Sequence, residues 1–202
     1  MRLSVIIPCL DESDQIAELL RSLQPLRSRG AEVIVVDGGS SDGTPDIAAP
    51  LADRVQAAPR ARATQMNAGA AAASGEVLLF LHADTRLPHE ADALVAQALS
   101  QPGRCWGRFD VHITGAHPVL RLVASLMNAR SRWSGIATGD QAIFVTRDAF
   151  DRVGSYAEIP LMEDIALSKR LKALGRPACL RACVTTSGRR WQRHGVLRTI
   201  FL

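Results

Sequence analysis

Two aspartates each follow a strongly apolar run of strand length in this sequence. The run VIVV leads to Asp37, and VLLFLHA leads to Asp84. An apolar run without polar alternation is typical of a strand buried on both faces, so each carboxylate is expected at the C-terminal edge of a parallel sheet, where open α/β sheets bind ligands. Two carboxylates at one edge are costly unless a cation or hydrogen-bond donors offset them. The pair therefore indicates a site for a metal or a polyhydroxylated ligand.

Length and composition predict one folded domain. The chain has 202 residues, of which 47% are hydrophobic and 22% charged, which argues against disorder. No apolar run reaches the roughly 20 residues that span a bilayer, and the first run is too short for a signal peptide, so we expect a cytoplasmic protein. The net charge of +4 is carried almost entirely by arginine, which suits a phosphorylated ligand. No basic block interleaved with aromatic residues indicates a nucleic-acid partner.

The four cysteines lack a CxxC pair. Buried free thiols in a reducing compartment are therefore favoured over a zinc site that uses Cys179 and Cys183.

Hydrophobic periodicity predicts alternating strands and helices, with a mostly parallel sheet flanked by helices and a smaller antiparallel part. Residues 104–114 alternate polar and apolar side chains, which favours a half-exposed antiparallel strand. At Thr44 and Pro45 we expect an N-cap followed by the first helical residue. The expected strands cover residues 3–8, 33–37, 54–56, 76–81, 104–114 and 142–145, and the expected helices cover 13–26, a short one from 44, 61–73, 90–99, 118–130, 148–153 and 163–174.

Five ordered segments carry a family resemblance: SVIIPCLDE, VIVVDGGSSDGT, RARATQMNAGAAAASGEVLLFLHADT, GDQAIFVTRDAF and LMEDIALSKRL. In this order they resemble the motifs of family 2 glycosyltransferases with the GT-A fold, from Leu3 to about Trp191. The resemblance implies a single GT-A domain, with residues 1–100 as the nucleotide-binding half and residues 101–202 as the acceptor side and C-terminal tail.

The resemblance also implies a nucleotide pocket. Its expected contacts are Pro8, Glu12, Asp37, Arg62 and His82, while Asn67 and Gly69 serve packing. Gly38 stands where many members have a second aspartate, so Asp37 is the stronger contact. Asp42 either contacts the ligand or caps its own turn. For Arg62, solvation on a helix surface is the alternative.

Metal coordination is expected at the segment His82 to Asp84. Asp84 matches the last acid of the family's DxD motif, which implies Mn²⁺ or Mg²⁺ bridging the diphosphate oxygens. His82 occupies the first acid position, where three interpretations stay open: binding manganese, binding ribose, or packing at the strand end. His194 is a candidate for a further metal ligand.

Glu163 and Asp164 match the family's ED motif, whose aspartate is the expected catalytic base. Spacing alone does not choose between the two acids, and both would also complement a helix dipole. Gly139, Asp140 and Gln141 match the segment beside the sugar and acceptor.

The C-terminal segment holds the remaining candidates. Arg190 and Trp191 either close over the diphosphate or acceptor, or belong to a solvated basic tail. Ser187 stands where processive relatives have glutamine, which argues against polymer synthesis. For the apolar residues 196–202 three interpretations stay open: contact with a membrane surface, contact with a partner such as a second copy of the chain, or a truncated continuation.

Together these features predict a metal-dependent inverting glycosyltransferase that moves a sugar from a nucleoside diphosphate sugar to a hydroxyl acceptor. One rival is a non-catalytic sugar-nucleotide-binding partner protein. The other is a nucleotidyltransferase, against which the acidic sequence CLDESD after the first strand argues.

Overall fold

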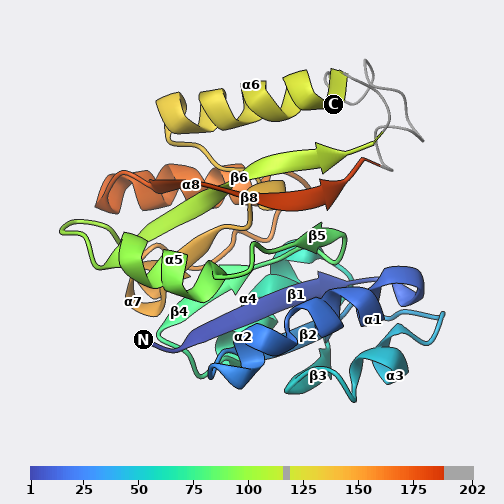
Figure 1. Cartoon of the computed structure of the whole chain (residues 1–202). Coiled ribbons are helices and arrows are strands. Elements are labelled where there is room, and N and C mark those ends of the chain that lie inside the picture. The colour runs from blue at the N-terminus through green and yellow to red at the C-terminus, as the bar shows by residue number, and fades with distance from the viewer. Residues whose placement is uncertain (116–118, 189–202) are drawn as a thin grey trace.

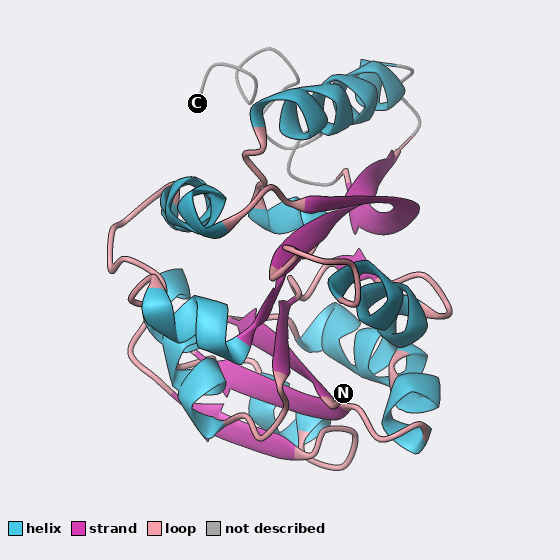
Figure 2. Cartoon of the chain, turned by 90° about the vertical axis from the view of Figure 1, so that its left-hand side faces the viewer, coloured by secondary structure: helices cyan, strands magenta, loops and turns pink. Residues whose placement is uncertain are grey.

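The computed structural model describes residues 1–115 and 119–188. It contains one eight-stranded sheet with the order β3-β2-β1-β4-β7-β6-β8-β5, covered by helices on both faces (Figures 1 and 2). The strands are β1 (Leu3–Cys9), β2 (Glu32–Asp37), β3 (Arg54–Ala57), β4 (Val77–Phe80), β5 (Thr85–Arg86), β6 (Trp106–Thr114), β7 (Phe144–Thr146) and β8 (Ala178–Ser187). The helices are α1 (Ser13–Ser22), α2 (Gln24–Ser28), α3 (Thr44–Ala48), α4 (Arg62–Ala72), α5 (Ala91–Leu99), α6 (Val119–Ser134), the 3₁₀ turn η1 (Gly139–Gln141), α7 (Arg147–Arg152) and α8 (Glu163–Leu174).

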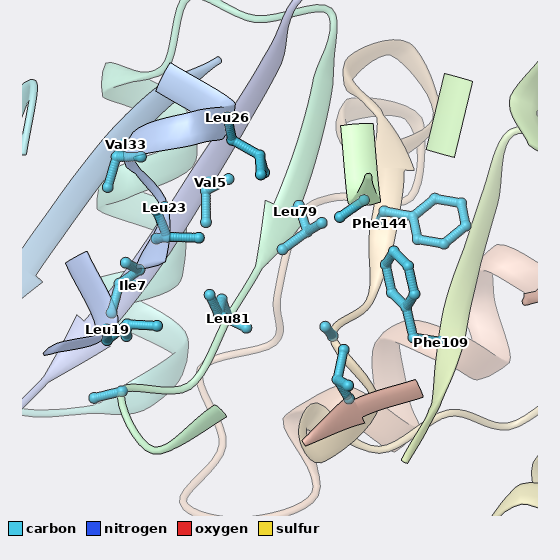
Figure 3. Packing of buried hydrophobic residues seen from close by; sticks show 14 of the residues in the cluster. Val5, Ile7, Leu19, Leu23, Leu26, Val33, Leu79, Leu81, Phe109 and Phe144 are labelled. Atoms are coloured by element: carbon cyan, nitrogen blue, oxygen red, sulfur yellow. The ribbon is translucent and has the colours of Figure 1, made fainter. Parts of the chain in front are cut away.

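The parallel half of the sheet confirms the expected alternation. Strand β1 lies between β2 and β4 and pairs with both in parallel, with Ile6 opposite Ile34 and Phe80. All seven residues of β1 are buried, as the unbroken apolar run requires. Successive side chains of β1 point to opposite faces, so Val5 and Ile7 pack with α1 on one face (Figure 3) while Ile6 packs with α4 and α7 on the other.

The second half of the chain adds an antiparallel strand, β7, and a strand that the sequence did not predict, β8. Strand β7 runs antiparallel to both β4 and β6, so β6, the strand expected to be antiparallel, is antiparallel to β7 alone. Strand β8, however, lies parallel to β6, and β5 pairs with its end. The run ACLRACVTTS has no regular apolar alternation, and its residues differ irregularly in burial, so periodicity gave no strand signal there.

Strand β6 is more deeply buried than the expected half-exposed strand. Its first four residues are all buried, including Arg108, whose side chain has no exposed surface. The guanidinium donates hydrogen bonds to Ser131 Oγ and to the Asn128 carbonyl, and it also pairs with Asp110. These partners offset the cost of burying a cation, which hydropathy patterns cannot show.

Three local expectations need correction. The single helix expected over residues 13–26 is two helices that meet at Leu23, because Pro25 lies in the first turn of the second. Gly43, at φ 82°, caps α3, and Thr44 is the first helical residue rather than the cap. Of the four free cysteines, which were expected to be buried, only Cys9 is buried, while Cys183 is exposed.

A close approach at Gly69 fixes α4 on the sheet. A Cβ at this position would lie 2.4 Å from Ile6 Cγ2 and 3.0 Å from Val36 Cγ2. Contacts this short require a neighbour to move, and both neighbours belong to buried strands. The packing role expected for Gly69 is therefore confirmed.

We predict that Gly69→Ala destabilises the protein although alanine is the better helix former. Overpacking costs about 1–3 kcal/mol, which exceeds the gain of about 1 kcal/mol in helix propensity. Urea unfolding should therefore show a lower midpoint for the variant. In an Ile6→Ala background, which removes the closer of the two clashing methyl groups, the same substitution should be less destabilising. A variant more stable than the wild type in both backgrounds would contradict this account of the packing.

Candidate active site

Two adjacent clefts open at the C-terminal edge of β1 and β4. The first is lined by acidic, basic and hydroxyl side chains, and the second, of about 560 Å³, continues toward α8. Both clefts share Pro8, Glu12 and Arg62, so they form one continuous groove along the edge of the sheet. The remaining lining includes His82, Asp84, Asp140, Thr186 and Ser187 in the first cleft and Arg60, Gln65, Leu161 and Glu163 in the second.

Asp84 is held in place by the end of β8. Its Oδ1 atom accepts hydrogen bonds from the hydroxyls of Thr85, at 3.2 Å, and Thr186, at 3.5 Å. The backbone amide of Ser187 also donates to the Asp84 carbonyl at 3.2 Å. The Oδ2 atom receives no hydrogen bond from any residue that the structure describes. One carboxylate oxygen is thus fixed by the fold while the other remains available for a ligand.

His82 contacts the turn that carries Asp140. The His82 Nδ1 atom lies 3.2 Å from Asp140 Oδ1, and the ring packs on Gly139. A Cβ at residue 139 would lie only 2.5 Å from His82 Nε2, so glycine is the residue that admits the imidazole here. The histidine is therefore engaged with the η1 turn, a contact that none of the three earlier interpretations included.

The two acids at the start of α8 point to different partners. Asp164 Oδ2 accepts a 2.5 Å hydrogen bond from the Gly139 amide. Glu163 is buried, with 5% of its surface exposed, and its Oε1 atom lies 3.7 Å from Arg62 Nη1. Spacing could not separate these acids, but the structure places Asp164 against the turn that holds His82 and Glu163 beside the groove arginine.

Two of the four non-glycine residues with positive φ in the described ranges flank the elements that carry Asp164 and Gly139. Met162, which precedes α8, has φ 64°, and Ala142, which follows η1, has φ 47°. Residues other than glycine adopt this left-handed conformation only where the surrounding structure enforces it, and such positions cluster at functional sites. The directions of Asp164 and Gly139 thus depend on strained neighbours.

Asp37 is bound to its own turn. Its carboxylate accepts hydrogen bonds from the amides of Gly39 and Ser40 and from the Ser40 hydroxyl, and it does not line either cleft of the groove. Burial on its own would raise the pKa of Asp37, but these hydrogen bonds outweigh it and lower the pKa below 3.8. Asp42 behaves similarly, since it accepts from the Ser13 and Thr44 amides, which supports the capping interpretation.

The other predicted positions divide into three groups. Asn67 exchanges two hydrogen bonds with the backbone of Tyr156, which confirms its packing role. Gln141 is fully buried and donates to Asn128 Oδ1, so it supports the η1 turn from behind instead of lining the groove. The predictions for Arg190, Trp191, His194 and residues 196–202 lie outside the described residues.

Sequence reasoning missed Thr186 and Ser187 as groove residues. Both belong to β8, the strand that gave no periodic signal. The only available cue was the run TTS, whose hydroxyls suit hydrogen bonding to a carboxylate.

We predict that Asp37→Asn lowers stability at neutral pH and that this loss shrinks in acid. Because the folded pKa is depressed, the stabilisation by the carboxylate is complete above the unfolded pKa and disappears as the pH falls through the folded value. Urea unfolding at pH 6, 4.5 and 3 should show the two proteins converging. Asp151→Asn, at an exposed position, controls for loss of a surface charge. A constant difference across this range would argue against the hydrogen-bonded carboxylate.

Comparison with known proteins identifies the family. Residues 4–157 match the sequence model of the family described as Glycosyl transferase family 2. The PGL/p-HBAD biosynthesis glycosyltransferase of Mycobacterium bovis (strain BCG / Pasteur 1173P2) is 33% identical over 173 residues, which cover 76% of this chain and 62% of that protein. The succinoglycan biosynthesis protein ExoA of Rhizobium meliloti (strain 1021) is 47% identical over 49 residues, which cover 24% of this chain and 15% of that protein. The chain thus spans less than two thirds of these relatives.

Solved structures share the fold. TarS 1–349 of S. aureus in complex with UDP superposes with a TM-score of 0.75 at 20% identity, covering 93% of this chain and 60% of TarS 1–349. The mannosyltransferase PcManGT of Pyrobaculum calidifontis in complex with GDP-Man and Mn²⁺ gives 0.70 at 22% identity, covering 91% of this chain and 56% of PcManGT. These agreements confirm the predicted GT-A architecture, and with the family match over residues 4–157 they lead to one conclusion: the chain belongs to glycosyl transferase family 2.

Proposed function

We propose that this chain transfers a sugar from a nucleoside diphosphate sugar to a hydroxyl acceptor, with inversion at the anomeric carbon. The observation that carries the proposal is that His82 and Asp84 line one cleft at the sheet edge, while Gly139, on which the His82 ring packs, donates a hydrogen bond to Asp164. The bound ligands named for two proteins of the same fold, UDP for TarS and GDP-Man for PcManGT, support this donor class. They differ in base, so the base stays open.

The groove offers complementary surfaces for the two parts of such a donor. The second cleft presents Arg60 and Arg62 beside the flat surface of Pro8 and the side chain of Leu161. Arginine pairs well with phosphate oxygens, and the apolar lining suits a base. We assign the nucleoside to this cleft and the diphosphate to the boundary near Arg62, which lines both clefts.

The protein ligands at this edge fit a divalent cation that the phosphates of the nucleotide sugar also bind. Asp84 supplies a carboxylate oxygen, and no complete cluster of protein ligands exists within the described ranges. Mg²⁺ and Mn²⁺ commonly bind through one or two carboxylates together with substrate phosphates, so this set is sufficient only with the diphosphate present. When bound, such a cation would offset the negative charge that grows on the departing diphosphate.

Asp164 is the proposed base. Its carboxylate takes the proton of the acceptor hydroxyl as the hydroxyl oxygen forms a bond to the anomeric carbon, and the bond from that carbon to the diphosphate oxygen breaks on the opposite side. The Gly139 amide fixes the orientation of Asp164, as a catalytic group requires. Glu163 instead balances the positive charge of Arg62.

We predict that Asp84→Asn removes the metal dependence of donor binding without altering the melting temperature. Calorimetry of UDP and GDP, each with and without Mn²⁺, measures the effect directly. The matched variant is His82→Asn, whose amide can keep the contact to Asp140; it should retain the metal dependence. A His82→Asn protein that loses it to the same degree as Asp84→Asn would place His82 among the cation ligands. Equal metal dependence in the wild type and Asp84→Asn would exclude Asp84 from the site.

We predict that Asp164→Asn lowers kcat by about two to four orders of magnitude with nearly unchanged donor affinity, because a base contributes chiefly to the transition state. Glu163→Gln should lower kcat less. It should also weaken donor binding, because Arg62 loses the ion pair that positions it in the groove. Turnover, donor affinity and melting temperature on both variants separate these roles. If both substitutions reduce only stability, the two acids act by complementing the helix dipole.

The same assays distinguish the rival functions. A wild-type protein that binds the nucleotide sugar but transfers no sugar to any hydroxyl acceptor would favour the non-catalytic binding protein. Transfer of a nucleotidyl group would favour the nucleotidyltransferase.

A further inference from the structure

The outer face of helix α6 carries a stripe of exposed apolar side chains. Leu122, Leu126 and Trp133 are 59%, 60% and 88% exposed. Residues spaced by four and eleven positions lie on the same side of a helix, so the three form one continuous surface. The opposite side of α6 packs on β6, and Figure 1 shows the helix at the edge of the molecule with nothing beyond it among the described elements. We call Leu122, Leu126 and Trp133 the α6 stripe.

Positive charge borders the α6 stripe. The helix sequence VLRLVASLMNARSRWS contains three arginines and no acidic residue. Arg121 and Arg130 are exposed and lie on opposite flanks of the stripe by helical spacing. Arg132 is also exposed but pairs with Asp110, so it contributes less net charge.

A basic cavity continues this surface at the C-terminal end of α6. It has a volume of about 430 Å³ and is lined by Trp133 of the stripe together with Arg104, Arg132, Lys172 and Arg176. No acidic side chain lines it. Lys172 donates to the Ser134 carbonyl and Arg104 to the carbonyls of residues 176 and 177, so these cations are held by the fold.

We propose that the α6 stripe and the basic cavity dock the protein on an anionic membrane surface. An amphipathic helix with an apolar face, flanking arginines and a tryptophan has the composition of helices that lie in the lipid interface. Arginines near an anionic surface add attraction, and the cavity is large enough to receive a phosphate headgroup. A second copy of this chain fits less well, because symmetric contact of two α6 helices would bring arginines of equal charge together. The proposal is independent of the transfer reaction, and no helix in the described ranges is long and apolar enough to cross a membrane.

Vesicle co-sedimentation of the full chain tests the proposal. The wild type should bind vesicles of phosphatidylcholine with 30% phosphatidylglycerol, a composition of about one anionic lipid in three, and should bind pure phosphatidylcholine at least about tenfold more weakly. Leu122→Ser/Leu126→Ser and Arg121→Ser/Arg130→Ser should each weaken binding to the anionic vesicles by about tenfold or more. High salt should weaken the wild type in the same way.

Matched control variants test whether vesicle binding depends on the place of the removed side chains or only on the loss of apolar or basic residues. Ile159→Ser/Leu161→Ser removes two exposed apolar side chains elsewhere, and Arg21→Ser/Arg54→Ser removes the same charge from the other half of the molecule. Both should retain wild-type vesicle binding. Addition of anionic vesicles should shift the tryptophan emission of the wild type to the blue, and Trp133→Phe should lose that shift.

Three results would overturn the proposal. The first is equal binding to both vesicle types or none at all, and the second is equal weakening by the control variants. The third is concentration-dependent dimerisation in sedimentation velocity that Leu122→Ser/Leu126→Ser abolishes, since the stripe would then be a contact between copies. None of these results bears on donor binding, so they leave the proposed transfer reaction untouched.

Discussion

Burial of β1 and β4 on both faces is the constraint from which the rest of the site follows. Neither strand can place a charge within its length, because each side chain meets packed hydrocarbon on one face or the other. Charged groups appear only beyond the ends of these two strands, where parallel pairing brings the loops of distant segments to one edge. The fold therefore brings Glu12, His82 and Asp84 into one groove, because the paired strands β1 and β4 both end at this edge.

The backbone of Gly139 connects the two sides of that groove. Its missing side chain makes room for His82, which follows β4, and its amide donates a hydrogen bond to Asp164 at the start of α8. Behind it, Gln141 joins Asn128, which in turn exchanges two hydrogen bonds with Val111 of β6. A short turn is thus fixed by contacts with His82, α6 and α8, which explains how a three-residue element can orient a carboxylate.

The sequence was most informative where local and global signals agree. The apolar runs predicted β1, β2 and β4 and the edge that carries Asp84, because each of these buried strands can be recognised from its own apolar composition. It failed at β8, whose residues form a strand only because β6 lies beside them. It also could not foresee that the Asp37 carboxylate accepts hydrogen bonds from its own turn or that Arg108 is buried, since both depend on partners that folding supplies. The resemblance to a family named the acids of the ED pair, while only the structure gave them different neighbours.

The support of Asp84 by β8 has a consequence for the order of folding. Thr85 pairs with Thr186, and their hydroxyls lie 3.1 Å apart across a separation of about one hundred residues in the chain. Contacts between such distant segments form late, because closing a long loop costs entropy before any pairing repays it. During synthesis on the ribosome, β1 to β4 would emerge and pair well before β8 exists. We therefore expect the nascent chain to pair β1, β2 and β4 first and to fix the Asp84 carboxylate in place only after β8 has been translated.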